Sequence, residues 1–484
     1  MKLSDLLQID PSHLANDVDV KGLTADSREV APGYIFAALV GTGLDGRNYI
    51  KSAVEQGAIA ILTDSGYEPS DCPIYCHQVD NPRRELAFLA ARFYKKVPQT
   101  VVAVTGTNGK TSVAHFVREI WQGLGLQAAS LGTLGVVTAH QTLPLNYTTP
   151  EPVLLHKKLA YLVDEGVTHL ALEASSHGLD QNRLDGIEIC AGGFTNLTHD
   201  HLDYHESKED YLKAKLGLVD RVVAVGGAAV LNADVPDYFR FKDAAETRGL
   251  SVLSYGHSGD QLKILDVTSH GAGQDITLEA FGNRCVVELK VAGEFQAMNM
   301  LCALGLIISA GGDFASALSV LPTVGNVPGR MELVSKTPAG ADVYVDFAHT
   351  PDALETVLKA LRPHAHGAIH AIIGCGGDRD KTKRPVMGRV AAEFADIVYV
   401  TDDNPRTENA AQIRSEILAA CPQAKEFADR EKAIHEALSR AANDDIVLIA
   451  GKGHESGQII GDTVIPFNDK EVAQRITSRL EAGK

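Results

Sequence analysis

The sequence predicts an α/β fold divided into about three domains. Three observations support this prediction: a length of 484 residues, short buried-strand patterns that alternate with helical spacing along the chain, and one strand–glycine turn–helix segment at 101–124. Pro98 marks a plausible first boundary, and a second change of pattern falls near residue 330. We therefore expect domains at 1–97, 98–330 and 331–484, the middle and last of them doubly wound.

The composition is that of an ordinary globular chain, with 45% hydrophobic and 22% charged residues. A net charge of −17 argues against broad binding of nucleic acid or of anionic membranes. The N-terminus has no apolar signal region, and no stretch reaches the ~18 apolar residues of a membrane span. We expect a cytoplasmic protein with no nucleic-acid partner and no membrane insertion.

The seven cysteines are scattered and odd in number. Cys72, Cys76 and His77 lie close together, but no second ligand pair follows at zinc-finger spacing. A structural role is the favoured interpretation, and reduced thiols fit a cytosolic protein.

The first domain alternates short strands and helices. Residues 33–41 and 59–62 are typical of strands, and 84–94 repeats apolar residues at helical spacing. The polar turns at 26–28 and 41–50 lie at strand ends, where a ligand could be held, but ordinary turn chemistry is the favoured interpretation.

The central segment VVAVTGTNGKT, residues 101–111, has the pattern of a phosphate-binding loop. A β-branched strand is followed by Gly106, Thr107, Asn108 and Gly109, and Lys110 opens a helix. Backbone N–H groups and the positive end of a helix would then surround one point, which suits a phosphate. Lys110 would reach the outer phosphates of ATP, and the Thr111 hydroxyl would face Mg²⁺. Val104 stands where the general motif has its first glycine, so that motif is met only in part.

Two further strands of the middle domain end in polar loops. Glu173 follows a buried run, where an unpaired carboxylate would be costly and a metal or a cation would offset that cost. A second strand runs into three histidines and two aspartates, whose spacing fits no closed zinc site and suits open Mg²⁺ coordination better: His199, His201, His205, Asp200 and Asp203. Lys215 shares a helix face with Tyr211 and Leu218, which we expect to pack, although a lysine that snorkels to solvent is the plain alternative.

The last domain contains four strand-then-turn segments, at 342–349, 367–377, 395–403 and 444–453, separated by helical spacing such as 387–394. In doubly wound sheets, ligands bind where the carboxyl ends of the strands converge. The turns there carry both signs of charge, which suits a zwitterion such as an amino acid: Asp346, His349, Asp378, Arg379, Lys381, Lys383, Arg384, Asp403, Asn404, Arg406, Lys452, His454 and Glu455. Asp-Asn-Pro-Arg occurs at 80–83 and again at 403–406, and only the second copy follows a strand of this domain.

Ten motifs in order resemble the Mur ligase family over essentially the whole chain. They are TGTNGKT (105–111), EASSHGLDQNR (173–183), TNLTHDHLDYH (195–205), AK (214–215), LNAD (231–234), PGRME (328–332), DFAHTPDAL (346–354), GCGGDRDKTKRP (374–385), DNPRTE (403–408) and GKGHE (451–455). The resemblance implies an N-terminal domain that binds a UDP-sugar-dipeptide, a central P-loop ATPase-like domain and a C-terminal Rossmann-like domain. The Walker-like variant at 105–111 is the family's own form.

The resemblance also implies roles for individual residues. Gly106, Thr107, Asn108, Gly109, Lys110 and Thr111 match the ATP loop, and Asn299, Arg330 and Asp346 match further ATP contacts, although FQAMN at 295–299 varies the family's Phe-Asn-x-x-Asn. Thr111, Glu173 and His201 match Mg²⁺ ligands, and Lys215 matches a lysine that carries a CO₂-derived carbamate able to orient a second Mg²⁺. UDP-MurNAc-dipeptide positions match Ser27, Thr148, Thr149, Ser175, Gln181 and Arg183. The positions that select meso-diaminopimelate match Arg379, Asp403, Asn404, Arg406, Gly451 and Glu455.

The function implied is ATP-dependent addition of meso-diaminopimelate to UDP-MurNAc-L-Ala-D-Glu through an acyl phosphate, in peptidoglycan precursor synthesis. Lys110, Lys215 and His349 are the catalytic candidates, and we expect a monomer. The last domain should close on the middle one before chemistry. The alternatives are a lysine-adding Mur ligase, whose relatives carry a different tetrapeptide at 403–406, a folylpolyglutamate synthetase-like ligase, or an ATP-binding switch that joins nothing.

Overall fold

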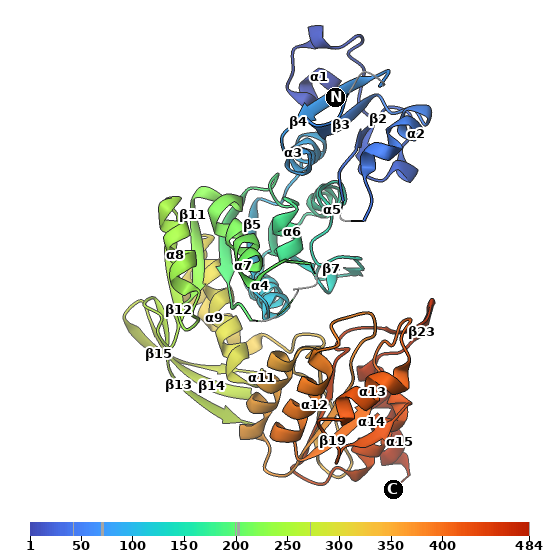
Figure 1. The fold of residues 1–484 in the computed structure, drawn as a ribbon. Helices are drawn as coiled ribbons and strands as arrows, with labels where there is room; N and C mark the ends of the chain where they lie inside the picture. The colour runs from blue at the N-terminus through green and yellow to red at the C-terminus, as the bar shows by residue number, and fades with distance from the viewer. Residues whose placement is uncertain (42, 69–71, 199, 201–203, 272, 484) are drawn as a thin grey trace.

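The computed structural model describes residues 1–41, 43–68, 72–198, 200, 204–271 and 273–483. Their strands form three large sheets that follow one another along the chain, and a two-stranded sheet near the C-terminus. Figure 1 shows three lobes, coloured blue, light blue through green to yellow, and orange to red. We name them the N-terminal, central and C-terminal lobes after their sheets, which span 22–79, 100–289 and 332–450. The predicted α/β class is confirmed, whereas the boundaries at 97/98 and 330/331 stay predictions.

The N-terminal lobe is a parallel sheet in the order β1-β2-β3-β4. The two predicted strands are β2 (Tyr34–Ala37) and β3 (Ala60–Asp64). The predicted helix begins two residues early, at Pro82, because Asn81 caps it by accepting a hydrogen bond from the Arg84 N–H. The other elements are α1 (Leu3–Leu7), β1 (Gly22–Thr24), α2 (Ile50–Glu55), β4 (Tyr75–Val79) and α3 (Pro82–Tyr94).

The central lobe contains an eleven-stranded sheet in the order β15-β14-β13-β12-β11-β10-β5-β9-β6-β7-β8. Strand β5 (Thr100–Thr105) lies between β9 and β10, and the direction in which the chain adds strands reverses there. Alternate β5 side chains enter two cores: Val102 and Val104 pack with α4 and α9, and Val101 and Ala103 with α5 and α7. Both faces of the strand are therefore buried, and its carboxyl end lies at a topological switch point.

The bounds of the remaining central elements are as follows. The strands are β6 (Ala128–Gly132), β7 (Gly135–Val137), β8 (Thr142–Leu143), β9 (His169–Glu173), β10 (Ile189–Phe194), β11 (Val223–Asn232), β12 (Ser251–Gly256), β13 (Leu262–His270), β14 (Gly273–Ala280) and β15 (Asn283–Leu289). The helices are α4 (Lys110–Gly123), α5 (Pro152–Asp164), α6 (Ser176–Asp180), α7 (Lys208–Gly217), α8 (Tyr238–Thr247), α9 (Glu294–Ser309) and α10 (Phe314–Val320).

The C-terminal lobe has a six-stranded sheet in the order β16-β17-β21-β18-β19-β20, in which only the edge strand β16 runs antiparallel. The parallel pairing confirms that the four polar turns of the last third lie at one edge of one sheet. The strands are β16 (Glu332–Lys336), β17 (Asp342–Asp346), β18 (Ile369–Ile373), β19 (Ile397–Thr401), β20 (Lys425–Phe427), β21 (Ile446–Ala450), β22 (Gly457–Ile460) and β23 (Thr463–Pro466). The helices are α11 (Pro351–Leu361), α12 (Lys383–Phe394), α13 (Ala410–Leu418), α14 (Arg430–Arg440) and α15 (Asp469–Ala482).

Specific contacts join neighbouring lobes. Val153 of α5 belongs to the core of the N-terminal lobe, and Ala292, which precedes α9, belongs to the core of the C-terminal lobe. The antiparallel strands β13 and β14 extend toward the C-terminal lobe (Figure 1), where the Gly271 carbonyl lies 2.8 Å from Nδ1 of His364. Among the described helices, none is long and apolar enough to cross a membrane.

Candidate active site

The glycine loop between β5 and α4 is held open by neighbouring side chains. The Asn108 N–H donates to Oδ1 of Asn196 at 2.9 Å, and the Thr195 hydroxyl donates to the Asn108 carbonyl at 2.6 Å. Gly106 and Gly109 have φ values of 151° and 91°, in the region that favours glycine. The backbone of the loop is therefore fixed before any ligand binds, with the N-terminus of α4 directed at the loop.

Two lysines share one carbonyl oxygen in this loop. Lys110 Nζ donates to the carbonyls of Gly106 at 2.8 Å and Thr107 at 2.9 Å, and Lys215 Nζ donates to the same Gly106 carbonyl at 2.7 Å. Burial lowers the pKa of both amines, that of Lys215 to well below its usual value, and the nearby Lys110 charge lowers the Lys215 pKa further. The pair favours an anion at the loop.

Lys215 occupies the buried helix face that the sequence predicted. Lys215 and Tyr211 are each 1% exposed and Leu218 is 0% exposed. The Lys215 amine lies 4.4 Å from the centre of the Tyr211 ring, and the Tyr211 hydroxyl lies 3.1 Å from the Thr107 hydroxyl. The side chain does not snorkel to solvent, so the alternative raised for it is wrong.

Glu173 is a buried carboxylate at the end of β9, 2% exposed. Its Oε2 accepts from the hydroxyls of Thr111 and Thr133, each at 3.0 Å, and its Oε1 accepts from the Thr133 N–H at 2.8 Å. Uncharged donors therefore offset the cost of burying this carboxylate. From the sequence, we expected a metal ion or a cation to offset it. No group of three or more His, Cys, Asp or Glu side chains within the described part of the chain is placed to hold a metal ion. His201, the predicted ligand, lies outside the described residues, as do His199 and Asp203.

Arg330 and Asp346 link the glycine loop to the C-terminal lobe. The Arg330 guanidinium lies 4.3 Å from the centre of the Phe347 ring, and its Nη2 donates to the Thr111 hydroxyl at 3.5 Å. Asp346, at the end of β17, accepts from the N–H groups of Met331 at 2.6 Å and Ala348 at 2.7 Å. Burial raises the pKa of Asp346, and Arg330 and the two N–H donors act against that rise.

Asn299 lies on α9 against the glycine loop. It is 6% exposed, and its Nδ2 donates to Oε1 of Gln296 at 3.0 Å. A Cβ added to Gly109 would lie 2.4 Å from Oδ1 of Asn299. Gln296, the residue that departs from the family pattern, thus sets the orientation of the amide that touches the loop.

Five of the six residues predicted to bind the UDP-sugar-dipeptide form one hydrogen-bonded group beside Glu173. Thr148 lies 3.1 Å from the Thr133 hydroxyl, Thr149 donates to the Glu173 carbonyl at 2.7 Å, and the Ser175 N–H donates to Thr149 at 3.0 Å. Arg183 donates to the Thr149 carbonyl at 2.5 Å and to Gln181 at 2.8 Å. Ser27 lies in a short turn of the N-terminal lobe, where its carbonyl accepts from Gln56 at 3.1 Å.

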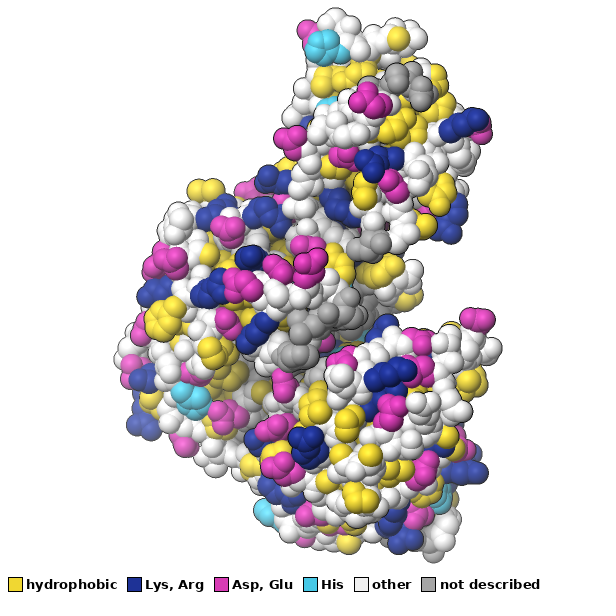
Figure 2. Space-filling model, viewed as in Figure 1, with side chains coloured by type: hydrophobic (Ala, Val, Ile, Leu, Met, Phe, Trp, Pro, Cys, Tyr) yellow, Lys and Arg dark blue, Asp and Glu magenta, His cyan; other side chains and the backbone are white. Residues whose placement is uncertain are grey.

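A cavity of about 770 Å³ is lined by the residues predicted to bind the amino acid, and residues of two lobes form its wall. His177 and Asp200 come from the central lobe, and the other lining residues belong to the C-terminal lobe. The latter are Phe347, His349, Thr350, Pro351, Gly376, Arg379, Asp380, Lys383, Asp403, Asn404, Arg406, Gly451 and Glu455. Figure 2 shows the molecule hollowed between these lobes, with side chains of both charges on the surrounding surface. All six predicted diaminopimelate positions line this one cavity.

The segment at 403–406 is held by the β22–β23 hairpin. Arg406 has a φ of 52°, which is uncommon for a residue with a side chain. Its N–H donates to the Ile459 carbonyl at 3.0 Å, and its carbonyl accepts from the Gly461 N–H at 2.8 Å. The guanidinium donates to the Gly377 carbonyl at 2.8 Å. The hairpin therefore keeps Arg406 in a strained backbone conformation at the cavity wall.

His349 is a neutral imidazole at the cavity. Burial lowers its pKa, and the charge of Lys383 lowers it further. Nδ1 lies 3.0 Å from the Phe347 carbonyl, and Lys383 Nζ donates to the carbonyl of His349 at 3.0 Å. An imidazole in this state can accept a proton.

Sequence reasoning missed Thr133 and gave no site role to Lys383 or Lys452. Thr133 carries two of the donors to Glu173, but no pattern marks an isolated threonine after a strand. Lys383 and Lys452 did fall within the predicted polar turns. The signal that could have separated them from solvated lysines is their position beside a carboxylate in the same turn, such as Glu455 for Lys452.

The fold and the site define a three-lobed α/β protein in which a glycine loop on one parallel sheet faces a mixed-charge cavity on a second. Three family models match it: Mur ligase family, catalytic domain, at 19–94; Mur ligase middle domain at 104–307; and Mur ligase, glutamate ligase domain, at 329–453. The chain belongs to the Mur ligase family.

Individual relatives match along nearly the whole chain. UDP-N-acetylmuramoyl-L-alanyl-D-glutamate--2,6-diaminopimelate ligases from Caulobacter vibrioides and Mesorhizobium japonicum are 50% and 48% identical. The alignments cover 97% of both chains for the first, and 97% of this chain and 98% of the relative for the second. A solved structure of a ligase with the same name is 31% identical, with a TM-score of 0.73 and 99% of each chain covered.

Replacing Gly109 with alanine should damage the loop more than the same change at Gly125, just beyond the other end of α4. Both glycines have positive φ, 91° and 81°, but a Cβ at Gly125 meets nothing within 4 Å. We expect G125A to lower the free energy of unfolding by about 1 kcal/mol and leave ADP affinity unchanged. G109A should also displace Asn299 and weaken ADP binding by at least about tenfold. Calorimetric titration checks this, and equal ADP affinities of the two variants would contradict it.

Proposed function

We propose that this protein is an ATP-dependent ligase that adds meso-2,6-diaminopimelate to the D-glutamate of UDP-MurNAc-L-Ala-D-Glu, in peptidoglycan precursor synthesis. The observation that carries the proposal is the cavity shared by the central and C-terminal lobes, because its lining holds both signs of charge. The names of the two relatives support the substrates. Residues 1–97 would bind the UDP-substrate, 98–330 ATP and 331–484 the amino acid, and the enzyme would act as a cytoplasmic monomer.

ATP would bind with its phosphates at the loop from Gly106 to Thr111. The fixed backbone of the loop and the two lysine amines at the Gly106 carbonyl support this placement. The Thr111 hydroxyl and the Glu173 carboxylate, 3.0 Å apart, are hard oxygen ligands of the kind that Mg²⁺ prefers, so the residues present fit that ion. Held by these two groups, Mg²⁺ would neutralise phosphate charge; His201 stays a predicted further ligand. Arg330 and Asp346 would hold the nucleotide from the C-terminal side, and Asn299 would contact it from α9.

Lys215 would carry a carbamate. An unprotonated amine can attack CO₂, forming an N–C bond and releasing one proton, and the burial of Lys215 favours the unprotonated amine. The product is an anion beside the loop, which would place a negative group next to the Lys110 amine. That change fits the crowding of Lys215 and Lys110 at one carbonyl.

The two substrates would meet in the cavity. Thr148, Thr149, Ser175, Gln181 and Arg183 would bind the dipeptide end beside Glu173, with Ser27 on the N-terminal lobe at the uridine end. Arg379, Asp403, Asn404, Arg406, Gly451 and Glu455 would bind diaminopimelate. The fork of Arg406 suits a bidentate contact with the distal carboxylate, which the side chain of lysine lacks.

A carboxylate and an ammonium form a salt at pH 7, so the acid must be activated. The D-glutamate carboxylate attacks the γ-phosphorus, an O–P bond forms, and the bond to ADP breaks. The amine then attacks the acyl phosphate, a C–N bond forms and inorganic phosphate leaves. Lys110 would stabilise the charge that develops on the phosphoryl group. His349, held neutral by burial and by Lys383, would accept the proton that the amine loses.

Release of phosphate in the presence of each substrate tests the proposed function. We expect release to require ATP, the UDP-dipeptide and diaminopimelate together, and lysine to replace diaminopimelate poorly. Preference for lysine would indicate the lysine-adding ligase, and use of a folate with glutamate the synthetase-like enzyme. Release from ATP with no acceptor would favour a nucleotide-driven switch.

Arg406→Lys keeps the positive charge and loses the fork. We expect the KM for diaminopimelate to rise by at least about tenfold while the KM for ATP changes by less than about twofold. Steady-state kinetics with each substrate varied in turn measures both constants. Lys381→Arg, a reverse exchange in the neighbouring turn, is the control, and an unchanged KM for diaminopimelate in R406K would remove Arg406 from the site.

Lys215→Ala should lose most of the activity, and added bicarbonate should not restore it. Short carboxylic acids should restore part of it, because they can place a carboxylate where the carbamate would lie. Lys213→Ala, on an exposed face of the same helix, should keep normal activity. Mass spectrometry after trapping the carbamate gives an independent reading, and its absence from active enzyme would contradict the assignment.

A further inference from the structure

The loop Gly451–Glu455 contains a fully buried lysine whose side chain points at the cavity wall and not at solvent. Lys452 is 0% exposed. Its Nζ donates to Oδ1 of Asn404 at 3.0 Å and to Oε2 of Glu455 at 3.0 Å. Both partners line the cavity, whereas Lys452 itself does not appear on the cavity surface.

These contacts determine how the Asn404 amide lies. Its Oδ1 accepts from Lys452 Nζ and from the Ile459 N–H, each at 3.0 Å. Its Nδ2 donates to Oε2 of Glu455 at 2.9 Å. A flipped amide would place N–H donors against a cation and a backbone donor, so the lysine allows only one orientation.

Glu455 is fixed by the same arrangement. Its Oε2 accepts from both Lys452 and Asn404, and Oε1 accepts no side-chain hydrogen bond within the described part of the chain. The Glu455 side chain is 36% exposed, so Oε1 is the oxygen free to meet a ligand in the cavity. An oxygen held in this way is suited to accept a hydrogen bond from an ammonium group.

We infer that Lys452 is a positioning residue for the amino-acid substrate: it orients the Glu455 carboxylate to accept a hydrogen bond from the ammonium end of an incoming diamino acid, and it fixes the Asn404 amide, whose Nδ2 donates to the same carboxylate. The inference rests on the proposed function, and it deepens that function by assigning the group that organises the ammonium end of the pocket. Lys452 touches no substrate in this account. It acts through its two partners, and its buried charge is balanced by the Glu455 carboxylate.

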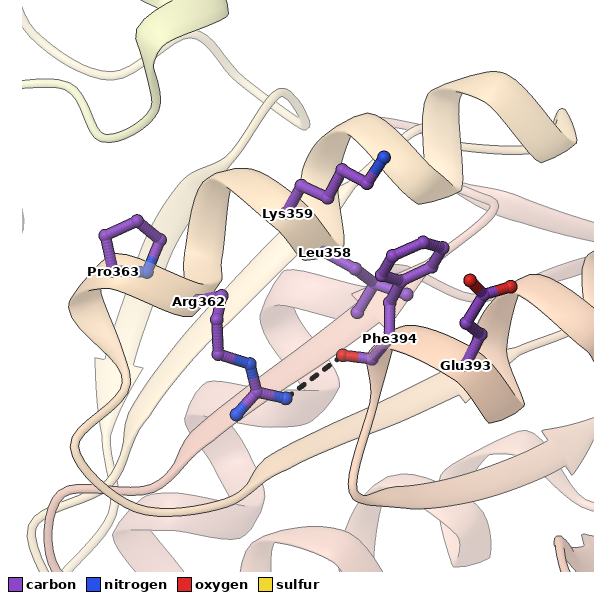
Figure 3. Close-up of a pocket in the computed structure, with 6 residues that line it drawn as sticks. All are labelled: Leu358, Lys359, Arg362, Pro363, Glu393 and Phe394. Carbon is purple, nitrogen blue, oxygen red and sulfur yellow. Dashed lines mark hydrogen bonds between the residues drawn. The ribbon is translucent and has the colours of Figure 1, made fainter.

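A lysine on the outer face of the same lobe provides a matched control. Lys359, on α11, borders a shallow pocket formed with Leu358, Arg362, Pro363, Glu393 and Phe394 (Figure 3). Its Nζ lies 4.8 Å from the centre of the Phe394 ring and pairs with Glu355, and its side chain is 56% exposed. A change of Lys359 to methionine removes the same charge from the lobe without reaching the cavity.

The experiment compares K452M with K359M and wild-type enzyme by steady-state kinetics. We expect K452M to raise the KM for diaminopimelate by at least about tenfold and to change the KM values for ATP and the UDP-dipeptide by less than about twofold. K359M should match wild type in all three constants. A normal KM for diaminopimelate in folded K452M would overturn the inference.

A second variant keeps the test decisive if K452M does not fold. The pair K452M/E455Q leaves no unpaired carboxylate, so it is compared with E455Q alone. Because the lysine acts on the ammonium end mainly through Glu455, we expect the two KM values for diaminopimelate to differ by less than about threefold. If the K452M change raised the KM for diaminopimelate in the E455Q background as much as it does in wild-type enzyme, the inference would be overturned. If wild-type enzyme released no phosphate in response to diaminopimelate, the proposed function itself would fail. If wild-type release were normal and the KM for diaminopimelate were unchanged in K452M, only the role of Lys452 would be wrong.

Discussion

Two lysine amines held against one backbone oxygen, the Gly106 carbonyl, are the interaction on which the site depends. Burying a charged amine costs several kcal/mol unless partners replace the lost water, and like charges in low dielectric add to that cost. The fold tolerates the arrangement because β5 packs into two separate cores on the two faces of the central sheet, and α4 packs into one of them. The buried amines thus favour an anion at the loop, where a polyphosphate would bind. A negative group on Lys215 or a bound phosphate relieves the same electrostatic problem.

The C-terminal lobe also contains buried cations, and these are already paired with carboxylates of the protein. Arg430 and Asp469 are both 0% exposed and form a two-point contact, with oxygen distances of 2.7 Å, that joins the N-termini of α14 and α15. Arg430 also donates to the Ala450 carbonyl at 2.9 Å, directly before the loop that carries Lys452. The loop is therefore anchored at its base by one buried cation and organised at its tip by another. Such pairs contribute more to a single geometry than to net stability.

The sequence predicted the strands, helices and turns that form the site far better than the side-chain contacts between them. The strand–turn–helix pattern located β5 and α4, and the four strand-then-turn segments of the last third were found with their polar turns at one sheet edge, because both signals are local. The spacing of Tyr211, Lys215 and Leu218 also gave the correct buried face. The donors to Glu173 could not be predicted, since Thr111 lies in the first turn of α4 and Thr133 follows β6, and the two meet only through the order of strands β5, β9 and β6. The same holds for Lys452 and Asn404, which lie 48 residues apart along the chain.

The division of the chemistry between lobes explains why the connections between them matter. Activation of the acid would take place at the central glycine loop, and delivery of the amine on the C-terminal sheet, so neither lobe would suffice alone. Arg330 spans that division: it stacks on Phe347 of the C-terminal lobe and reaches the Thr111 hydroxyl, which in turn bonds to Glu173. Because Asp346 holds the backbone next to Arg330 through the Met331 N–H, a shift of the C-terminal sheet would move the guanidinium relative to Thr111. The geometry of the phosphate site is therefore tied physically to the position of the lobe that would carry the second substrate.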